Sequence, residues 1–141
     1  MTAVAEAATE WVFMDMSARR PVRIPEEQNV YGLHPDEPLS MRPAKRKIRL
    51  PEDLTREKAF QIQEYHLDTN KHVNNAQYVR MAMRFLPPGS ETHYLRVEFK
   101  KQALLGDTVV PHISFREDPT SMIVQLADTE GESFFVGEFT G

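Results

Sequence analysis

The chain has 141 residues, a formal net charge of -4 and no cysteine. This length suits a single domain, the acidic balance argues against nucleic acid as a partner, and the missing thiols exclude disulfides, cysteine nucleophiles and cysteine-ligated zinc. The sequence also lacks an apolar run of about 18 residues that could span a membrane and lacks the basic start of a signal peptide, so we expect a soluble, cytoplasmic protein.

The first 53 residues predict one strand followed by a long linker. Residues 10–16, EWVFMDM, are apolar and rich in strand formers. Because proline has no backbone N–H donor and is rare inside sheets, residues 21–53 predict an extended linker that lies over a surface. We therefore assign residues 1–20 to a separate segment and residues 54–141 to the main domain. The prolines of the linker are Pro21, Pro25, Pro35, Pro38, Pro43 and Pro51.

A strand and a helix are predicted next. Residues 58–67 suit a strand in which Phe60 and Ile62 share one face. Residues 74–86, NNAQYVRMAMRFL, contain no glycine or proline and predict a helix, which the following Pro-Pro-Gly would end. Other apolar side chains of this segment suggest that a sheet covers more than one side of the helix. Its main apolar face is expected to comprise Ala76, Val79, Ala82, Met83 and Leu86.

The remaining residues predict an antiparallel meander. Apolar and polar side chains alternate in three segments, 95–99, 109–115 and 122–126, which is typical of strands with one buried face. Residues 104–107, LLGD, are expected to turn the chain, and Pro111 suggests an edge or a bulge. A helix followed by four strands, with one or two strands before it, predicts an α+β fold with a helix on a sheet.

The segment DTNKHVNN, residues 68–75, concentrates polar groups before the helix. If it is extended, Asp68, Asn70 and His72 point to the same side. Either Asn74 or Asn75 would cap the helix, whose first free amides could then hold the oxygen of a carbonyl under attack. The simpler alternative is that these residues only cap the helix and that the histidine bonds a backbone carbonyl.

The segment YHLDTNKHVNNAQYV, residues 65–79, resembles the signature of the acyl-acyl carrier protein (acyl-ACP) thioesterases. Residues 96–109 are similar to the strand and turn that follow the helix in this family, and residues 10–27 resemble the end of its first unit. The resemblance implies a hotdog fold, in which an antiparallel sheet wraps around a long central helix. It also implies hydrolysis of a thioester that joins a fatty acyl chain to the phosphopantetheine arm of the carrier protein. We expect neither a cofactor nor a metal.

The resemblance assigns roles by matching position. His72 is expected to act as the general base or to orient water, Asn70 to contact the thioester or the water, and Asp68 to orient or polarise the site. Tyr78 is a candidate for lining the acyl channel, although an aromatic residue on a buried helix is more often part of the core. Gln102 would offer a hydrogen bond. The remaining two expected substrate-binding positions are Asn74 and Asn75, through the amides at the helix start.

The sequence departs from the family pattern at two positions. Plant members carry a glutamate and a cysteine, which can ionise, where this chain has Gln102 and Ala103, which cannot. Two interpretations stay open, a water-mediated mechanism and a reduced activity. The chain also matches only the C-terminal one of two hotdog units, so it is either a fragment or a unit that pairs with itself, and we expect a homodimer.

Several interpretations remain in competition. A basic run could dock the acidic carrier protein or could simply be a solvated linker; it comprises Arg42, Lys45, Arg46, Lys47 and Arg49. The histidines show no metal-ligand spacing, and His66 and His112 are assigned to ordinary packing. For the function itself, acyl-CoA hydrolysis and a catalytically silent acyl-binding half-domain are the alternatives to acyl-ACP hydrolysis.

Overall fold

The computed structural model describes residues 5, 7–9, 12–15, 17–18, 20–27, 47–117 and 120–141. The chain forms two compact units, residues 1–45 and residues 46–141, which are described separately. In the first unit, β1 (Met14–Asp15) pairs with β2 (Arg20–Pro21) as a short antiparallel hairpin. Strand β1 lies within the strand predicted at residues 10–16, of which residues 10, 11 and 16 lie outside the described part.

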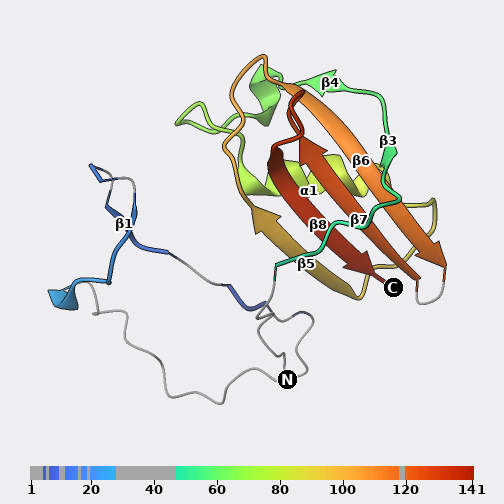
Figure 1. Ribbon diagram of the computed structural model, residues 1–141, viewed down its shortest axis with the longest axis horizontal. Coiled ribbons are helices and arrows are strands. Elements are labelled where there is room, and N and C mark those ends of the chain that lie inside the picture. The colour runs from blue at the N-terminus through green and yellow to red at the C-terminus, as the bar shows by residue number, and fades with distance from the viewer. Residues whose placement is uncertain are drawn as a thin grey trace. The chain divides into compact units, whose positions relative to one another are not determined.

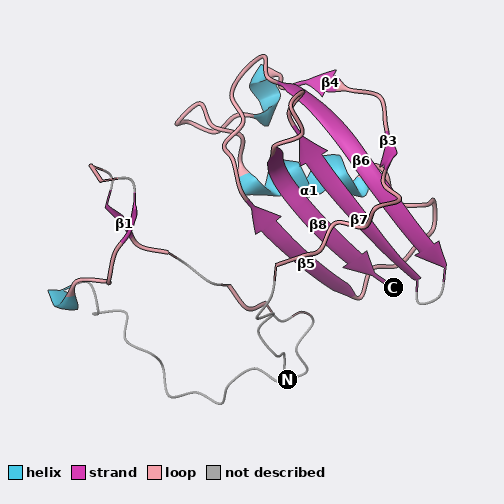
Figure 2. Cartoon of the chain, viewed as in Figure 1, coloured by secondary structure: helices cyan, strands magenta, loops and turns pink. Residues whose placement is uncertain are grey.

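The second unit is an antiparallel sheet with one α-helix across one face, as Figures 1 and 2 show. The strand order is β3-β6-β7-β8-β5, and β4 also pairs with β6. This arrangement confirms the predicted α+β class. The elements are β3 (Thr55–Arg56), β4 (Phe60–Gln61), the 3-10 helix η2 (Glu64–His66), α1 (Asn75–Met83), β5 (Tyr94–Phe99), β6 (Thr108–Glu117), β7 (Thr120–Ala127) and β8 (Ser133–Thr140).

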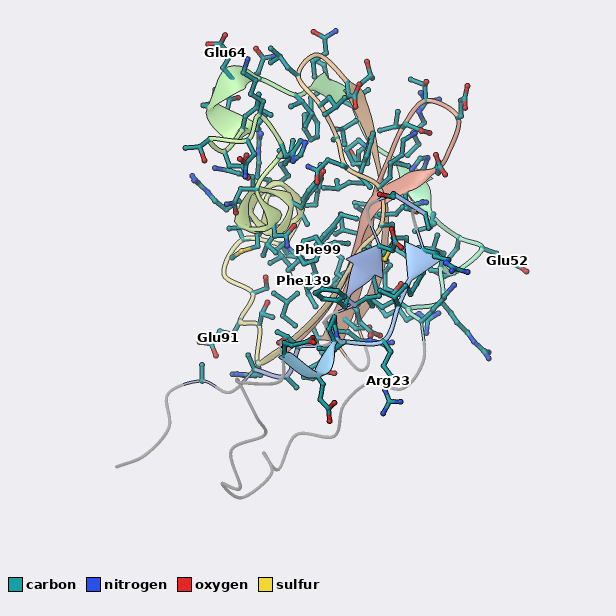
Figure 3. All side chains as sticks on the ribbon, turned by 90° about the vertical axis from the view of Figure 1, so that its left-hand side faces the viewer. Arg23, Glu52, Glu64, Glu91, Phe99 and Phe139 are labelled. Carbon is teal, nitrogen blue, oxygen red and sulfur yellow. The ribbon has the colours of Figure 1, made fainter. Side chains whose placement is uncertain are left out.

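The alternation seen in the sequence places one apolar row of the sheet against α1. In the register of β5 with β8, Leu95 lies opposite Phe139 and Phe99 lies opposite Phe135. The ring of Phe135 stacks on that of the helical Tyr78 at 6.1 Å between centroids, so this face of the sheet is the one the helix covers. Figure 3 shows Phe99 and Phe139 on this same face, between the strands and the helix. The apolar rows of β7 and β8 thus face the helix as predicted, but the predicted wet face of β5 is wrong, because Leu95 and Phe99 are exposed whereas the two polar residues between them are half-buried.

Pro111 lies inside the sheet, at a point where one of the two ladders of β6 is interrupted. On one side β6 pairs with β7 along most of its length. On the other side β3 pairs with Ile113 and His112, whereas β4 pairs with Val109 and Thr108, so the proline falls between the two short strands. The carbonyl of Pro111 still accepts a hydrogen bond from the Glu57 amide at 2.9 Å. The missing N–H thus explains why two strands replace one here.

The strand connections differ from the predicted meander in one respect. Only β6, β7 and β8 follow one another as neighbours, whereas β5 pairs with β8 at one end of the sheet order. Residues 100–107 therefore cross from that edge to the start of β6 on the other side of β7 and β8. The predicted turn at residues 104–107 is confirmed, because the Asp107 amide bonds the Leu104 carbonyl and Gly106 adopts a φ of +84°.

The strand and helix predicted between residues 58 and 86 are shorter in the structure. The strand predicted at 58–67 is reduced to Phe60–Gln61, and η2 follows it. The helix spans nine residues, and the predicted face is wrong at Ala76 and at Met83, which are exposed. Its buried residues are Tyr78, Met81 and Ala82. An aromatic ring buries more apolar area than an alanine, so the helix turns Tyr78 towards the sheet.

A strap formed by residues 47–54 crosses the face of the sheet opposite α1, where Figure 1 shows it in front of the strands. Ile48 is buried there, and its amide donates to the Glu98 carboxylate at 2.6 Å. Further along the strap, the Asp53 carboxylate accepts a hydrogen bond from the Ser114 hydroxyl at 3.2 Å. Residues 28–46 of the predicted linker lie outside the described part. In the part that the structure describes, no helix is long and apolar enough to cross a membrane.

Candidate active site

The segment expected to carry the chemistry is a tight turn that leads into α1. Leu67 and Val73 lie opposite each other as an isolated antiparallel bridge. Between them, the Asp68 amide donates to the His72 carbonyl at 2.8 Å, and the Lys71 amide donates to the Asp68 carbonyl at 3.0 Å. Lys71 has a φ of +60°, the left-handed conformation that lets the chain reverse. The prediction of an extended segment is therefore wrong.

The carboxylate of Asp68 organises this Asp68–His72 turn. Its Oδ1 atom accepts the backbone amide of Asn70 at 2.8 Å and that of His72 at 3.1 Å. Short polar side chains commonly compete in this way for nearby amides, and here the competition is what prevents an extended strand. The three predicted residues are therefore brought together by backbone bonds to one carboxylate.

The side chains of Asn70 and His72 remain available to a ligand. Both residues are exposed, and within the described part of the chain neither the carboxamide nor the imidazole makes a hydrogen bond to protein. An exposed imidazole that no protein group occupies can accept a proton from bound water. The expected alternative, in which this histidine bonds a backbone carbonyl, does not occur among the described residues.

Asn74, and not Asn75, is the N-cap of α1. Its side chain accepts the Ala76 amide at 2.9 Å, and its carbonyl accepts the Gln77 amide at 2.9 Å. The Asn74 amide itself donates to the carbonyl of His66 at 3.3 Å. Among the described groups of the first turn, the amide of Asn75 has no protein acceptor. Fewer amides are therefore free to bind a carbonyl oxygen than the sequence suggested. Among the described groups of the first turn, the free amide is that of Asn75.

The other two predicted substrate contacts, Gln102 and Tyr78, make hydrogen bonds to other residues of the chain. The Gln102 side-chain nitrogen donates to the Val73 carbonyl at 3.2 Å. The Tyr78 hydroxyl oxygen accepts the Ala103 amide at 2.9 Å, and the residue is 2% exposed. Burial, with a further contribution from Asp107, raises the pKa of Tyr78, so the phenol stays protonated at neutral pH. The structure thus places Tyr78 in the core beneath the helix start.

His66 is a residue of this site to which sequence reasoning gave only a packing role. It is 7% exposed, and its Nδ1 atom accepts the Gln63 amide at 2.9 Å, so the ring proton lies on Nε2. Burial, and then the charges of Arg84 and Arg80, lower its pKa. At neutral pH the His66 ring is therefore neutral and accepts the Gln63 amide before the turn, while the His66 carbonyl accepts the Asn74 amide after it. The spacing of three between Gln63 and His66 is the sequence signal for this local arrangement.

The basic run is only partly described. Lys47 and Arg49 are exposed at the start of the strap, whereas Arg42, Lys45 and Arg46 lie outside the described residues. A cavity of about 290 Å³ lies beside the strap, lined by Ile48, Leu50, Lys100, Lys101, Glu132, Ser133 and Val136. Since Val136 is on the face of β8 opposite Phe135, this cavity is on the other side of the sheet from α1 and from the Asp68–His72 turn.

Comparison with known proteins identifies the family. Residues 51–138 match the acyl-ACP thioesterase C-terminal domain. The chain is 26% identical over 143 residues to the oleoyl-acyl carrier protein thioesterase 2 of Arabidopsis thaliana chloroplasts; the match covers 92% of this chain and 39% of the relative.

Among solved structures, an acyl-ACP thioesterase from Bacteroides thetaiotaomicron superposes with a TM-score of 0.74 at 13% identity, covering 90% of this chain and 52% of that one. The 12:0-ACP thioesterase of Umbellularia californica superposes with a TM-score of 0.69 at 18% identity, covering 89% and 51%. These similarities confirm the hotdog fold, and the chain spans about half the length of the solved proteins. The family match extends over more than half of the chain, from the middle of the strap through most of β8, and the chain therefore belongs to the acyl-ACP thioesterase family as its C-terminal domain.

Proposed function

We propose that this chain is a thioesterase unit that hydrolyses fatty acyl-ACP to the free fatty acid and the carrier protein. The observation that carries the proposal is the exposed imidazole of His72, in a turn before a helix where the Asp68 carboxylate accepts the backbone amides of Asn70 and His72. Family membership and the names of the related proteins support this activity. The carrier-protein substrate is the part of the proposal that those relatives suggest most directly.

The proposed reaction uses the groups of the turn in sequence. His72 accepts a proton from a water molecule, and the water oxygen attacks the carbonyl carbon of the thioester. The developing oxyanion lies near the Asn75 amide and the positive end of α1, while Asn70 orients the water or the carbonyl. The carbon–sulfur bond then breaks, and the proton on His72 passes to the departing thiolate. Water thus supplies the new oxygen of the acid. One of its protons passes through His72 to the thiol, and the other stays on the acid.

A histidine variant tests this assignment. We expect His72→Ala to lower kcat by about 10²- to 10⁴-fold, the usual contribution of a positioned base. The matched control is His93→Ala, because His93 is also exposed and its imidazole lies 3.8 Å from the Glu91 carboxylate, away from the Asp68–His72 turn. The His72 variant should keep its thermal stability, since the imidazole makes no protein hydrogen bond. Full turnover by the His72 variant would exclude the proposed role.

The competing functions are separated by substrate. Free-thiol release should be measured side by side with acyl-ACP and with acyl-CoA at equal acyl chain length. Faster release from acyl-ACP supports the proposal, whereas a preference for acyl-CoA favours the second candidate. Binding of an acyl chain without release of thiol from either substrate would identify a silent half-domain. Docking of the acidic carrier through the basic run, with Lys47 and Arg49 exposed, predicts that binding weakens as salt is added.

We further propose that two copies of the chain pair to complete the site. Strand β5 ends the sheet order, and no described strand pairs with its second edge. Apolar side chains are exposed along it: Leu95 by 41% and Phe99 by 43%. An open edge flanked by apolar groups favours association. Light scattering should give about twice the mass of 16.3 kDa, and Leu95→Asp should weaken the pair. A monomer at micromolar concentration would refute pairing.

A further inference from the structure

The crossing segment between β5 and β6 touches the start of α1 at two consecutive residues. Gln102 donates its side-chain N–H to the Val73 carbonyl at 3.2 Å. Ala103 donates its backbone N–H to the Tyr78 hydroxyl at 2.9 Å. Val73 directly follows His72 and directly precedes the N-cap Asn74. We call these two hydrogen bonds the clasp.

The two bonds of the clasp differ in their surroundings. Tyr78 and Ala103 are 2% and 0% exposed, and the tyrosine ring is stacked in parallel on Phe135. Loss of the hydroxyl would leave the Ala103 amide buried without an acceptor, which is costly. Gln102 is exposed, although the Val73 carbonyl that it bonds belongs to a buried residue. The tyrosine therefore provides the stronger contact and the glutamine lies nearer the reactive turn.

We propose that Gln102 and Tyr78 are positioning residues, which hold the Asp68–His72 turn and the first turn of α1 at a fixed height above the sheet. This inference rests on the proposed thioesterase function. The clasp acts through Val73, because a shift of its carbonyl is passed along the chain to His72 on one side and Asn74 on the other. Small displacements of reacting groups lower rates strongly, by as much as about 10²-fold for 1 Å.

The clasp explains why a glutamine, and not a glutamate, suits position 102. The Val73 carbonyl needs a hydrogen-bond donor, which a carboxamide supplies and an ionised carboxylate cannot. Gln102 therefore has a positioning role that an ionised glutamate at the same place could not fill. The nearby charges are already engaged, since Lys101 pairs with Asp128 and Glu132, and the Asp107 carboxylate accepts the Leu104 amide.

The first test replaces the donor while keeping the shape. For Gln102→Glu at pH 7 we expect kcat to fall about 10- to 100-fold while KM changes less than about threefold. Protonation of the new carboxyl restores an O–H donor, so the ratio of variant to parent kcat should rise as the pH falls towards about 4–5. Gln61→Glu, at an exposed strand position, controls for the added charge. A gain in rate, or a ratio independent of pH, would overturn the role of Gln102.

The second test does not depend on activity. Hydrogen exchange in the full chain should become faster at residues 68–76 in Gln102→Glu and in Tyr78→Phe, while the amides of β7 and β8 keep their protection. Tyr65→Phe is the matched control, because Tyr65 is 74% exposed. Unchanged exchange at residues 68–76 in both variants refutes the clasp. Faster exchange in a chain without thioesterase activity instead refutes the proposed function and leaves the clasp intact.

Discussion

Asp68 offers a test of whether a carboxylate acts through shape or through charge. Its Oδ1 atom accepts two backbone amides, those of Asn70 and His72, at 2.8 and 3.1 Å. Asp68→Asn keeps an oxygen at this position and removes the charge, whereas Asp68→Ala removes both. If the turn is the main contribution of Asp68, the asparagine variant should retain much of the activity and the alanine variant should lose it.

The geometry sets the size of the expected effect. Hydrogen bonds to a charged group contribute about 1.5–3 kcal/mol each, and neutral ones about 0.5–1.5 kcal/mol. Because Asp68 is only half-buried, we take about 1 kcal/mol for each of its two bonds. Asp68→Ala should then favour opening of the turn by about 2 kcal/mol, or roughly 30-fold, and Asp68→Asn by about half of this free energy, or roughly fivefold.

Amide exchange and hydrolysis should be measured on the same samples. The exchange rates of the Asn70 and His72 amides report opening of the turn, and thiol release reports its consequence. Asp15→Ala is a matched control, since Asp15 Oδ1 accepts the amides of Ser17 and Ala18 in the same way in the first unit. Parent-like exchange in Asp68→Ala would refute the reasoning about the turn. Activity lost equally in both Asp68 variants, with a closed turn in Asp68→Asn, would show that charge matters instead.

Three further changes test the fold around the site. Lys71→Gly should stabilise the protein by about 0.5–1 kcal/mol, because the position has a φ of +60°; denaturant unfolding measures this, and a loss of stability would contradict it. Gly137→Ala places a Cβ 2.8 Å from the Phe135 ring and should cost about 1–3 kcal/mol, which thermal unfolding would detect as a Tm lowered by several degrees. Although burial opposes ionisation of Glu98, hydrogen bonds from Lys100 and the Ile48 amide and the neighbouring cations lower its pKa, so its stabilising effect is present at neutral pH and is lost as the pH falls below about 4.5. Glu98→Gln should flatten that dependence of Tm on pH, and an unchanged slope would exclude the strap contact as its source.

Much of the architecture followed from local patterns. The alternation in residues 109–115 and 122–126 predicted most of the residues that pack in the core with the helix, because a strand presents successive side chains to opposite faces whatever its partners are. In residues 95–99 the same pattern did not predict burial, since Leu95 and Phe99 are exposed. Pro111 was expected at an edge or a bulge, but it lies within β6, between the residues that pair with β3 and those that pair with β4; its missing N–H interrupts that ladder. The helix start was also readable, because an asparagine at the N-cap bonds amides only two residues away.

The site was less accessible to sequence reasoning. The spacing of Asp68, Asn70 and His72 suggested three side chains on one side of a strand, but a carboxylate that bonds two amides makes a turn instead. The roles of Tyr78 and Gln102 depend on contacts with residues 25 and 29 positions away in the chain. No local pattern encodes such contacts.

The sequence by itself therefore determined which strand residues share a face, the helix start and the family, because each depends on neighbours within a few positions or on a short signature. Tertiary structure decided the rest. Burial against Phe135 selected the Tyr78 face of α1, and placing β5 beside β8 sent residues 100–107 across to the start of β6, by way of the start of the helix. Packing between distant segments settles such choices, because the free energy of burial is gained only when those segments meet.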